Sequence, residues 1–458
     1  MPILDWIGKK QVINHDKEVP FRLLKRVDSL SVGESENLII KGDNLEALKA
    51  LLPYYYNKVK CIYIDPPYNT GNENWIYNDK VNSPEIKKWL GRVVGSEGED
   101  LSRHDKWLCM IYPRLKLLRE LLAEDGVIFV SIDDDEVHNL RALMNEIFGV
   151  ENFVCSIVWQ KKHTRSNDAR WFSDNHDYIV LFAKNKNKWR PNLLPRSDVK
   201  NNIYSNPDND PRGVWASGPC HAKTPNPKDI YKIKTPSGRK LLPPAGTSWR
   251  FSKKRFQELI NDNRIYFGEN GSNVPRYKRF LSEVQEGLVP ITLWLRDEVD
   301  DNQKGRNELR QIFSDAETIF QTPKPVRLIK RIIQLSSGKD DIILDSFAGS
   351  GTTAHAVLEL NKEDKDSGNR KFILVEMEDE IARKVTAERV KRVIKGYTYK
   401  NSRGENVKVK GLGGAFQFMN LDTELFNAHG LINDNISYTD LARYIFFSET
   451  KLDLKEKV

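Results

Sequence analysis

The chain has 458 residues, enough for two domains or for one domain with a second inserted into it. Its 39% hydrophobic and 30% charged residues are typical of a globular protein and exclude a disordered one. No apolar run approaches the roughly 20 residues that span a bilayer, and the first ten residues lack a signal-peptide core, so we expect a cytoplasmic protein. The formal net charge of +8 is compatible with a nucleic-acid partner and does not by itself require one.

The first part of the chain alternates short apolar strands with amphipathic helices. This alternation predicts a mostly parallel sheet covered by helices on both faces. We expect strands at 37–42, 59–64, 126–132, 152–159 and 178–183, and helices at 43–52, 106–124 and 133–148.

The pattern is interrupted between residues 161 and 289, where Pro, Asn, Lys, Arg and Trp dominate and periodicity is weak. This stretch is too long for a connecting loop, so it predicts an inserted, irregular domain. The α/β pattern then returns, and after residue 401 the signal weakens into what we expect to be a small appendage. The predicted divisions are 1–160, 161–289, 290–400 and 401–458, with strands expected at 341–345 and 371–376 and helices at 325–336 and 353–360.

The four cysteines are far apart and form no C-x-x-C pair, so neither zinc nor redox chemistry is expected. We expect reduced thiols that are mostly buried. They are Cys61, Cys109, Cys155 and Cys220.

A glycine-rich turn, 346–354, follows the strand expected at 341–345 and leads into a helix. Glycines there allow a ligand to approach the backbone, and a helix N-terminus offers free N–H groups. The spacing of Gly349, Gly351 and Ala354 fits a dinucleotide fingerprint, yet alone it does not distinguish NAD, S-adenosylmethionine and a turn without ligand. Glu376 ends the next strand, where an acidic side chain reaches ribose hydroxyls in such folds.

The sequence Asp65-Pro66-Pro67-Tyr68 ends the buried strand expected at 59–64. Two prolines fix φ twice and remove two backbone donors, which predicts a rigid turn at the carboxyl end of the strand. The turn offers a carboxylate, the free Pro66 carbonyl and an aromatic face. Together these groups suit a planar aromatic amine, with its N–H groups on Asp65 and the Pro66 carbonyl and its ring on Tyr68.

Because it contains both motifs, the sequence resembles the β-class amino-methyltransferases of DNA, and most closely the Mod subunits of type III restriction–modification systems. The resemblance extends from about residue 38 to 447. It is carried by DPPYNTG at 65–71 and FAGSGTT at 347–353, with the catalytic motif first and the cofactor turn last. Matching segments include YPRL at 112–115, SIDDDEVHNL at 131–140, NPDNDPRG at 206–213 and TPKP at 322–325.

This resemblance implies a Rossmann-like, circularly permuted methyltransferase sheet in which 161–289 is the target-recognition domain. It implies that Asp65, Pro66, Pro67 and Tyr68 hold a flipped adenine and that S-adenosylmethionine is the methyl donor. It also implies double-stranded DNA as substrate, a homodimer, and a Res helicase-nuclease as partner. The implied cofactor contacts are Asp43, Thr322, Lys324, Pro325, Asp345, Phe347, Ala348, Gly349, Ser350, Gly351, Thr352, Thr353 and Glu376.

Two weaker features concern charged clusters. The acidic run 133–136 is expected to cap the helix that follows it rather than to bind metal, and no metal site is expected.

Basic residues interleaved with aromatics in the inserted stretch are candidates for DNA contact. They are Lys161, Lys162, Arg165 and Arg170, beside Trp159 and Trp171, and further along Arg250, Lys253, Lys254, Arg255, Arg276, Lys278 and Arg279.

Three alternatives remain open from the sequence. The same cofactor and turn could methylate cytosine N4, an RNA base or a protein amide, although Asp65 favours adenine in family terms. The chain could instead serve chiefly as the DNA-recognition subunit of a nuclease or helicase partner. An NAD-dependent dehydrogenase would leave the DPPY turn and the insertion unexplained.

Overall fold

The computed structural model describes residues 3–70, 91, 102–166, 169–195, 203–283, 287–316, 320–427 and 429–454. The chain forms two compact units, one of residues 1–192 with 291–458 and one of residues 193–290. The second unit therefore begins later than the predicted boundary at 161. Residues 161–192 belong to the first unit because strand β6 (His176–Ala183) pairs with β4 and β5 of the main sheet.

The first unit is built on a ten-stranded sheet in the order β1-β20-β2-β17-β16-β3-β4-β6-β5-β15. From β20 to β4 every neighbouring pair is parallel, as the alternating pattern predicts, and β6 is antiparallel to both of its neighbours. The strands are β1 (Arg22–Arg26), β2 (Leu38–Lys41), β3 (Val59–Ile64), β4 (Leu122–Ile132), β5 (Phe153–Gln160), β15 (Leu293–Trp294), β16 (Ile342–Asp345), β17 (Lys371–Glu376) and β20 (Gln417–Glu424).

The strand order positions the site. The late strand β16 lies between the late strand β17 and the early strand β3, and it is parallel to both. Parallel neighbours end at the same edge of a sheet, so the turns that follow β3 and β16 lie side by side although about 280 residues separate them in the sequence. Ligands of open α/β sheets bind at this carboxyl edge.

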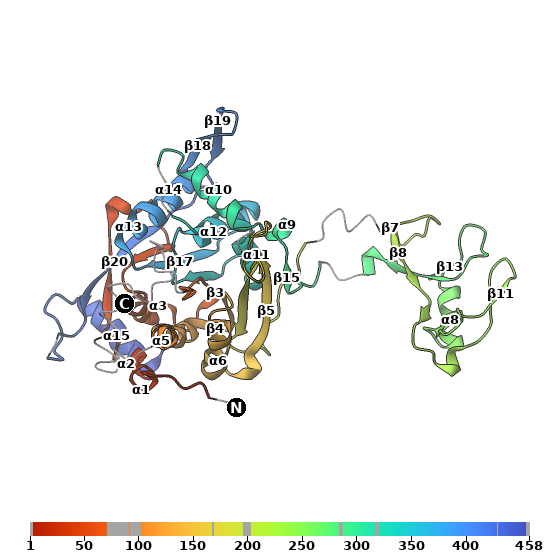
Figure 1. Ribbon diagram of the computed structural model, residues 1–458, viewed down its shortest axis with the longest axis horizontal. Helices are drawn as coiled ribbons and strands as arrows, with labels where there is room; N and C mark the ends of the chain where they lie inside the picture. Colours follow the sequence, from red (N-terminus) through yellow and green to blue (C-terminus); the bar gives the residue numbers. More distant parts are fainter. Residues whose placement is uncertain are drawn as a thin grey trace. The chain divides into compact units, whose positions relative to one another are not determined.

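The helices of the first unit form two groups, which lie on opposite sides of the strands β17 and β3 in Figure 1. One group contains α3 (Asn44–Tyr55), α5 (Arg103–Leu121) and α6 (Val137–Phe148), and the other α10 (Asn302–Ile312), α11 (Val326–Ser336), α12 (Thr352–Glu363) and α14 (Glu388–Lys395). Shorter or peripheral helices are α1 (Lys9–Val12), α2 (His15–Glu18), α9 (Arg296–Val299), α13 (Asp379–Ile381) and α15 (Tyr438–Thr450), and a hairpin joins β18 (Gly396–Lys400) to β19 (Asn406–Lys410).

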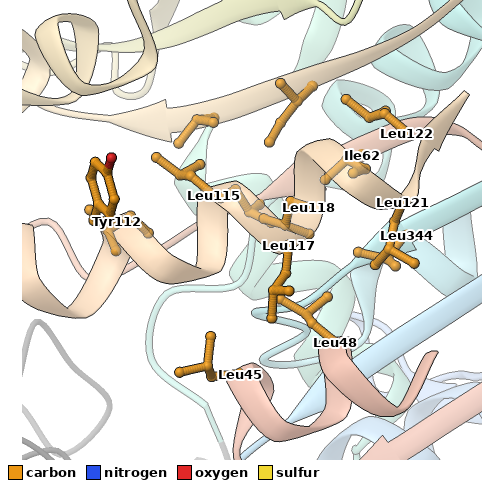
Figure 2. Close-up of a cluster of buried hydrophobic side chains, with 14 of the residues drawn as sticks. Leu45, Leu48, Ile62, Tyr112, Leu115, Leu117, Leu118, Leu121, Leu122 and Leu344 are labelled. Carbon is orange, nitrogen blue, oxygen red and sulfur yellow. The ribbon is translucent and has the colours of Figure 1, made fainter. Parts of the chain in front are cut away.

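Figure 2 shows the core between the first helix group and the sheet. Leucines of α3 and α5 lie against Ile62 of β3 and Leu344 of β16, and all of these side chains are almost completely buried. Burial of one such side chain contributes roughly 1.5–3 kcal/mol. This core therefore fixes β3 and β16, the two strands whose ends carry the motifs.

The C-terminal segment differs from the predicted appendage. Strand β20 pairs in parallel with β2 and antiparallel with β1, so it is an inner strand of the main sheet. The prediction of a separate appendage at 401–458 is therefore wrong for this strand. The short, mixed polar sequence of β20 does not predict a strand. Only its pairing with the distant strands β1 and β2 identifies it as one.

The second unit has a small sheet in the order β13-β14-β8-β7 and its own core around Trp249 and Phe256. Lys278 is fully buried there and pairs with Asp208 and Asp210, so it is not a surface candidate for DNA contact. The elements are β7 (Tyr204–Ser205), β8 (Trp215–Pro219), β9 (His221–Ala222), β10 (Ile233–Lys234), β11 (Lys240–Leu241), β12 (Ser248–Trp249), α8 (Lys253–Asn261), β13 (Ile265–Tyr266) and β14 (Arg276–Phe280).

No helix of the described ranges combines the length and the apolarity that a membrane crossing needs. No cluster of metal-ligating side chains occurs among those residues either. The cysteines are free thiols, with Cys155 partly buried and the other three buried.

Candidate active site

Hydrogen bonds from distant residues hold the DPPY turn, which follows β3. The indole Nε1 of Trp107 donates to the Pro67 carbonyl at 2.7 Å. Asn69 adopts the left-handed conformation, with φ of 62°, and its amide donates to the fully buried Glu136 carboxylate at 2.5 Å. The Pro66 carbonyl accepts no hydrogen bond from any residue of the described ranges, so it is available to a ligand. The last residue of the resembling heptapeptide, Gly71, lies outside those ranges.

The glycine-rich turn is held from two sides. The Asp345 carboxylate accepts from the Phe347 backbone at 3.1 Å and from the Thr353 hydroxyl at 2.5 Å. Glu376, at the end of β17, accepts from the Gly349 backbone at 2.8 Å. Both carboxyl groups are buried, and burial raises the pKa of each to about 7.

Glycine is required at two positions of this turn by conformation and by space. Gly349 and Gly351 have φ values of +50° and +77°, which favour residues without a Cβ atom. A Cβ on Gly349 would lie 2.9 Å from the Phe320 ring, and one on Gly351 would lie 3.2 Å from Thr386. Thr386 belongs to a π-helical segment between α13 and α14 and donates to the Gly349 carbonyl at 2.6 Å.

Lys324 links the two turns. Its ammonium lies 2.7 and 2.6 Å from the two oxygens of Asp65 and 5.0 Å from the centre of the Tyr68 ring. Its backbone carbonyl accepts from the Thr352 hydroxyl at 3.2 Å. The resemblance implies that Lys324 packs beside the cofactor. The structure also shows it as the direct partner of Asp65, a pairing that no local sequence signal reveals.

Both turns open into one cavity of about 730 Å³. Most of the predicted site residues line it, while Asp43, Pro325 and Gly351 do not. The predicted residues that do are Asp65, Pro66, Pro67, Tyr68, Thr322, Lys324, Asp345, Phe347, Ala348, Gly349, Ser350, Thr352, Thr353 and Glu376.

Asp43 lies at the N-terminus of α3 and does not line the cavity. Its carboxylate caps α3 by accepting from the backbones of Leu45 and Glu46, and it pairs with Arg114 at 3.2 Å. The next residue, Asn44, lines the cavity and donates to the Ser346 carbonyl at 3.3 Å. The capping role is what the structure shows of Asp43, and the implied contact with the cofactor adenine stays a prediction.

The acidic run 133–136 also differs from the prediction. Helix α6 begins at Val137, and its N-cap residue, Glu136, makes no side-chain capping bond. Glu136 instead accepts from Asn69 and contacts His104 at 2.7 Å. Asp133 lines the cavity, where burial raises its pKa to about 7. Glu136 therefore supports the DPPY turn through Asn69 rather than capping the helix.

The basic candidates for DNA contact separate into buried and exposed groups. Lys161 lines the cavity and pairs with Asp174 and Asp177, each at 2.7 Å, so it is bound within the first unit. Lys162 donates to the Ser166 hydroxyl at 2.7 Å. The others are exposed, namely Arg165, Arg170, Arg250, Lys253, Lys254, Arg255, Arg276 and Arg279.

A close backbone contact sets the position of Lys324. A Cβ on Gly305 of α10 would lie 2.4 Å from the Pro323 oxygen and 3.1 Å from the Lys324 carbonyl carbon. We expect Gly305→Ala to lower the free energy of unfolding by about 1–2 kcal/mol, because overpacking against backbone outweighs the roughly 1 kcal/mol gain in helix propensity.

Chemical denaturation measures the effect of Gly305→Ala. Gly218→Ala is the matched control, because its nearest neighbour would lie 3.4 Å away, and it should change the free energy by at most about 0.5 kcal/mol. An unchanged or higher stability of the Gly305 variant would contradict the close contact.

A parallel sheet with a carboxylate turn and a glycine-rich turn at one cavity defines the class of α/β enzymes that bring a nucleotide-like ligand to a polar substrate. The chain belongs to the DNA methylase family, whose model matches residues 59–388 and so includes both turns.

Three characterised proteins are similar in sequence to most of this chain. The StyLTI Mod subunit of Salmonella typhimurium, from a type III restriction-modification enzyme, is 36% identical over 78% of this chain and 54% of the relative. The EcoPI Mod subunit of Escherichia phage P1 is 33% identical over 82% of this chain and 64% of the relative. The type II methyltransferase M.KpnI of Klebsiella pneumoniae is 31% identical over 73% of this chain and 79% of the relative. The chain thus spans between about half and two thirds of the length of these Mod subunits.

Proposed function

We propose that the chain transfers a methyl group from S-adenosylmethionine to the N6 amine of a flipped adenine in double-stranded DNA. The observation that carries the proposal is the single cavity shared by Asp65–Tyr68 and the glycine-rich turn. Family membership supports DNA methylation. The resemblance to the β-class amino-methyltransferases implies that an aspartate at position 65 favours adenine over cytosine.

The cavity suits the proposed methyl donor. The Ser346 hydroxyl, on the cavity wall, is buried and has no hydrogen-bond partner among the described residues. Glu376 presents a buried carboxylate at the same wall, and Gly349, which also lines the cavity, has no side chain between its backbone and a ligand. We propose that Glu376 binds the ribose hydroxyls and that the glycine-rich turn holds the methionine portion.

The residues of the DPPY turn would position the nucleophile. When bound, S-adenosylmethionine supplies a methyl group already activated on a sulfonium. One amine N–H of the adenine would donate to Asp65 and the other to the Pro66 carbonyl, which aims the nitrogen lone pair at the methyl carbon. A carboxylate has about four acceptor sites, so Asp65 can accept this bond while Lys324 remains paired with it. Asp65 or water can take the surplus proton after transfer.

Tyr68 would stack on the extruded base and offset part of the unstacking cost, which is on the order of a few kcal/mol. Burial raises the pKa of Tyr68 well above its usual value, so the phenol stays protonated and neutral. A neutral ring face suits a neutral base.

We further propose that residues 193–290 recognise the target sequence and that the chain acts as a homodimeric Mod-type subunit together with a Res helicase-nuclease. The exposed Arg250, Lys253, Lys254 and Arg276 of this unit supply positive charge for phosphate contact. Co-purification with a helicase-nuclease and sedimentation of the free protein test these two assemblies.

Burial of Glu376 predicts that cofactor binding depends on pH. Its folded-state pKa of about 7 means that the carboxylate is lost as the pH falls through 7. We expect the Kd for S-adenosylmethionine to rise by up to about tenfold per pH unit below pH 7, because a hydroxyl acceptor is lost. Calorimetric titration between pH 6 and 8.5 measures this change.

Glu376→Gln is the control for this pH dependence. It should bind more weakly at pH 8 and show a flatter profile, with the remaining slope assigned to Asp345 and Asp133, whose pKa values are also raised to about 7. The raised pKa favours the protonated form in the folded state, so this group's stabilising effect grows from pH 7 down to about 4.5. Unfolding of this site therefore does not explain weaker binding at pH 6. A Kd independent of pH in the wild type would contradict the assignment.

The test of the proposed reaction is analysis of nucleosides from duplex DNA incubated with the protein and methyl-labelled S-adenosylmethionine. Label in N6-methyl-2′-deoxyadenosine supports the proposal. Label in N4-methylcytosine would move the assignment to the cytosine amine.

A further inference from the structure

The loop between β5 and β6 starts and ends at the wall of the cavity. Lys161 and Asp177, at its two ends, both line the cavity that contains Asp65. The Lys161 ammonium pairs with Asp177 and with Asp174, each at 2.7 Å, and so ties the two ends together. The residues between these two ends therefore extend from the rim of the proposed adenine pocket.

The base of the loop is a hydrogen-bonded structure. The Asn175 amide donates to the carbonyls of Lys162, His163 and Thr164 at 3.2 to 3.4 Å. The Ser173 hydroxyl accepts from the Ser166 backbone at 2.9 Å and donates to Asn175 at 2.7 Å. These bonds fix the direction in which the chain leaves the rim.

Among the described residues beyond this base are two adjacent aromatic side chains that are almost fully exposed. Trp171 is 82% and Phe172 95% exposed, and the Arg170 guanidinium lies 5.3 Å from the Trp171 ring. Two neighbouring exposed aromatics form an apolar patch of the kind that a partner covers in interaction sites. Arg165 and Arg170 are exposed on the same loop, so the charge of the partner is expected to be negative.

We propose that Trp171 and Phe172 insert into duplex DNA beside the target base and occupy the space that the extruded base leaves. This inference rests on the proposed function. Apolar side chains that enter a base stack offset the cost of unstacking, and a rim position is where the gap forms when a base enters the cavity. Arg165 and Arg170 contact the flanking phosphates.

The test uses the full chain with Trp171→Ala and Phe172→Ala combined, on two duplexes that carry the methylated motif. One duplex has thymine opposite the target adenine, and the other has an abasic site there, so extrusion breaks no base pair. Tyr438→Ala is the matched control, because Tyr438 is 86% exposed on α15. Single-turnover methylation rates and the Kd for S-adenosylmethionine are measured for each protein.

We expect the double variant to be about tenfold slower or more on the paired duplex and within about threefold of wild type on the abasic duplex. Its Kd for S-adenosylmethionine and the rates of Tyr438→Ala should match wild type. Equal slowing on both duplexes, or none, overturns the inference. So does a change of oligomeric state in the double variant, because the aromatic pair would then join two copies of the chain. If wild type methylates neither duplex, the proposed function itself fails and this inference fails with it.

Discussion

Asp65→Ala is expected to lower kcat by about 10²–10³-fold, the loss typical when one preorganised polar contact to the reacting group is removed. Asp65 is the carboxylate that would orient the adenine amine, and it ends a strand whose core packing does not depend on it. The affinity for S-adenosylmethionine should stay within about threefold of wild type, since the glycine-rich turn keeps its own contacts with Asp345 and Glu376. Single-turnover methylation and calorimetric titration measure the two quantities.

The Asp65→Asn variant is the control for folding. The Lys324 side chain is only 10% exposed, so alanine at position 65 leaves its ammonium poorly solvated and without this partner. Asparagine keeps an oxygen acceptor for Lys324 and fills the same volume. We expect Asp65→Asn to melt close to wild type and still to turn over slowly. Wild-type kcat in either variant would exclude Asp65 from catalysis.

Lys324→Met is the second change with a large expected effect, a fall in kcat of about 10–10²-fold. Methionine fills much of the volume but removes the cation that holds both Asp65 oxygens at 2.7 and 2.6 Å. The carboxylate then loses its fixed orientation beside Tyr68. Single-turnover rates measure the loss, and thermal melting checks the fold.

A double-mutant cycle distinguishes positioning from a merely structural role. If Lys324 acts through Asp65, then Lys324→Met should have little further effect on the rate in an Asp65→Asn background. Lys324→Arg should recover part of the rate, because it keeps a cation at the same position. Additive effects of the two substitutions would show that Lys324 acts independently of Asp65.

The regular parts of the fold follow from local patterns. The strands predicted at 59–64 and 371–376 have the observed bounds of β3 and β17, because each is a continuous apolar run closed by a charged or proline-rich turn. The α/β class and the membership of the DNA methylase family are confirmed. The family membership is recognisable from the two motifs, because each motif follows a strand that the sequence already predicts to be buried.

The features that the sequence does not reveal depend on long-range contacts. The pairing of Lys324 with Asp65 joins residues 259 positions apart, and β20 is recognisable only beside β1 and β2. Glu136 is the N-cap residue of α6, but its carboxylate contacts the distant Asn69 and His104 and does not cap the helix. The roles of the individual cofactor and DNA contacts stay predictions.

The most direct test of the account is single-molecule sequencing of genomic DNA from a methylation-free host that expresses this chain, beside the same host expressing Asp65→Ala. The account predicts N6-methyladenine within one short motif in the first host and none in the second. Unmodified DNA in both hosts, with the protein folded and present, would contradict the claim that this chain methylates adenine by itself.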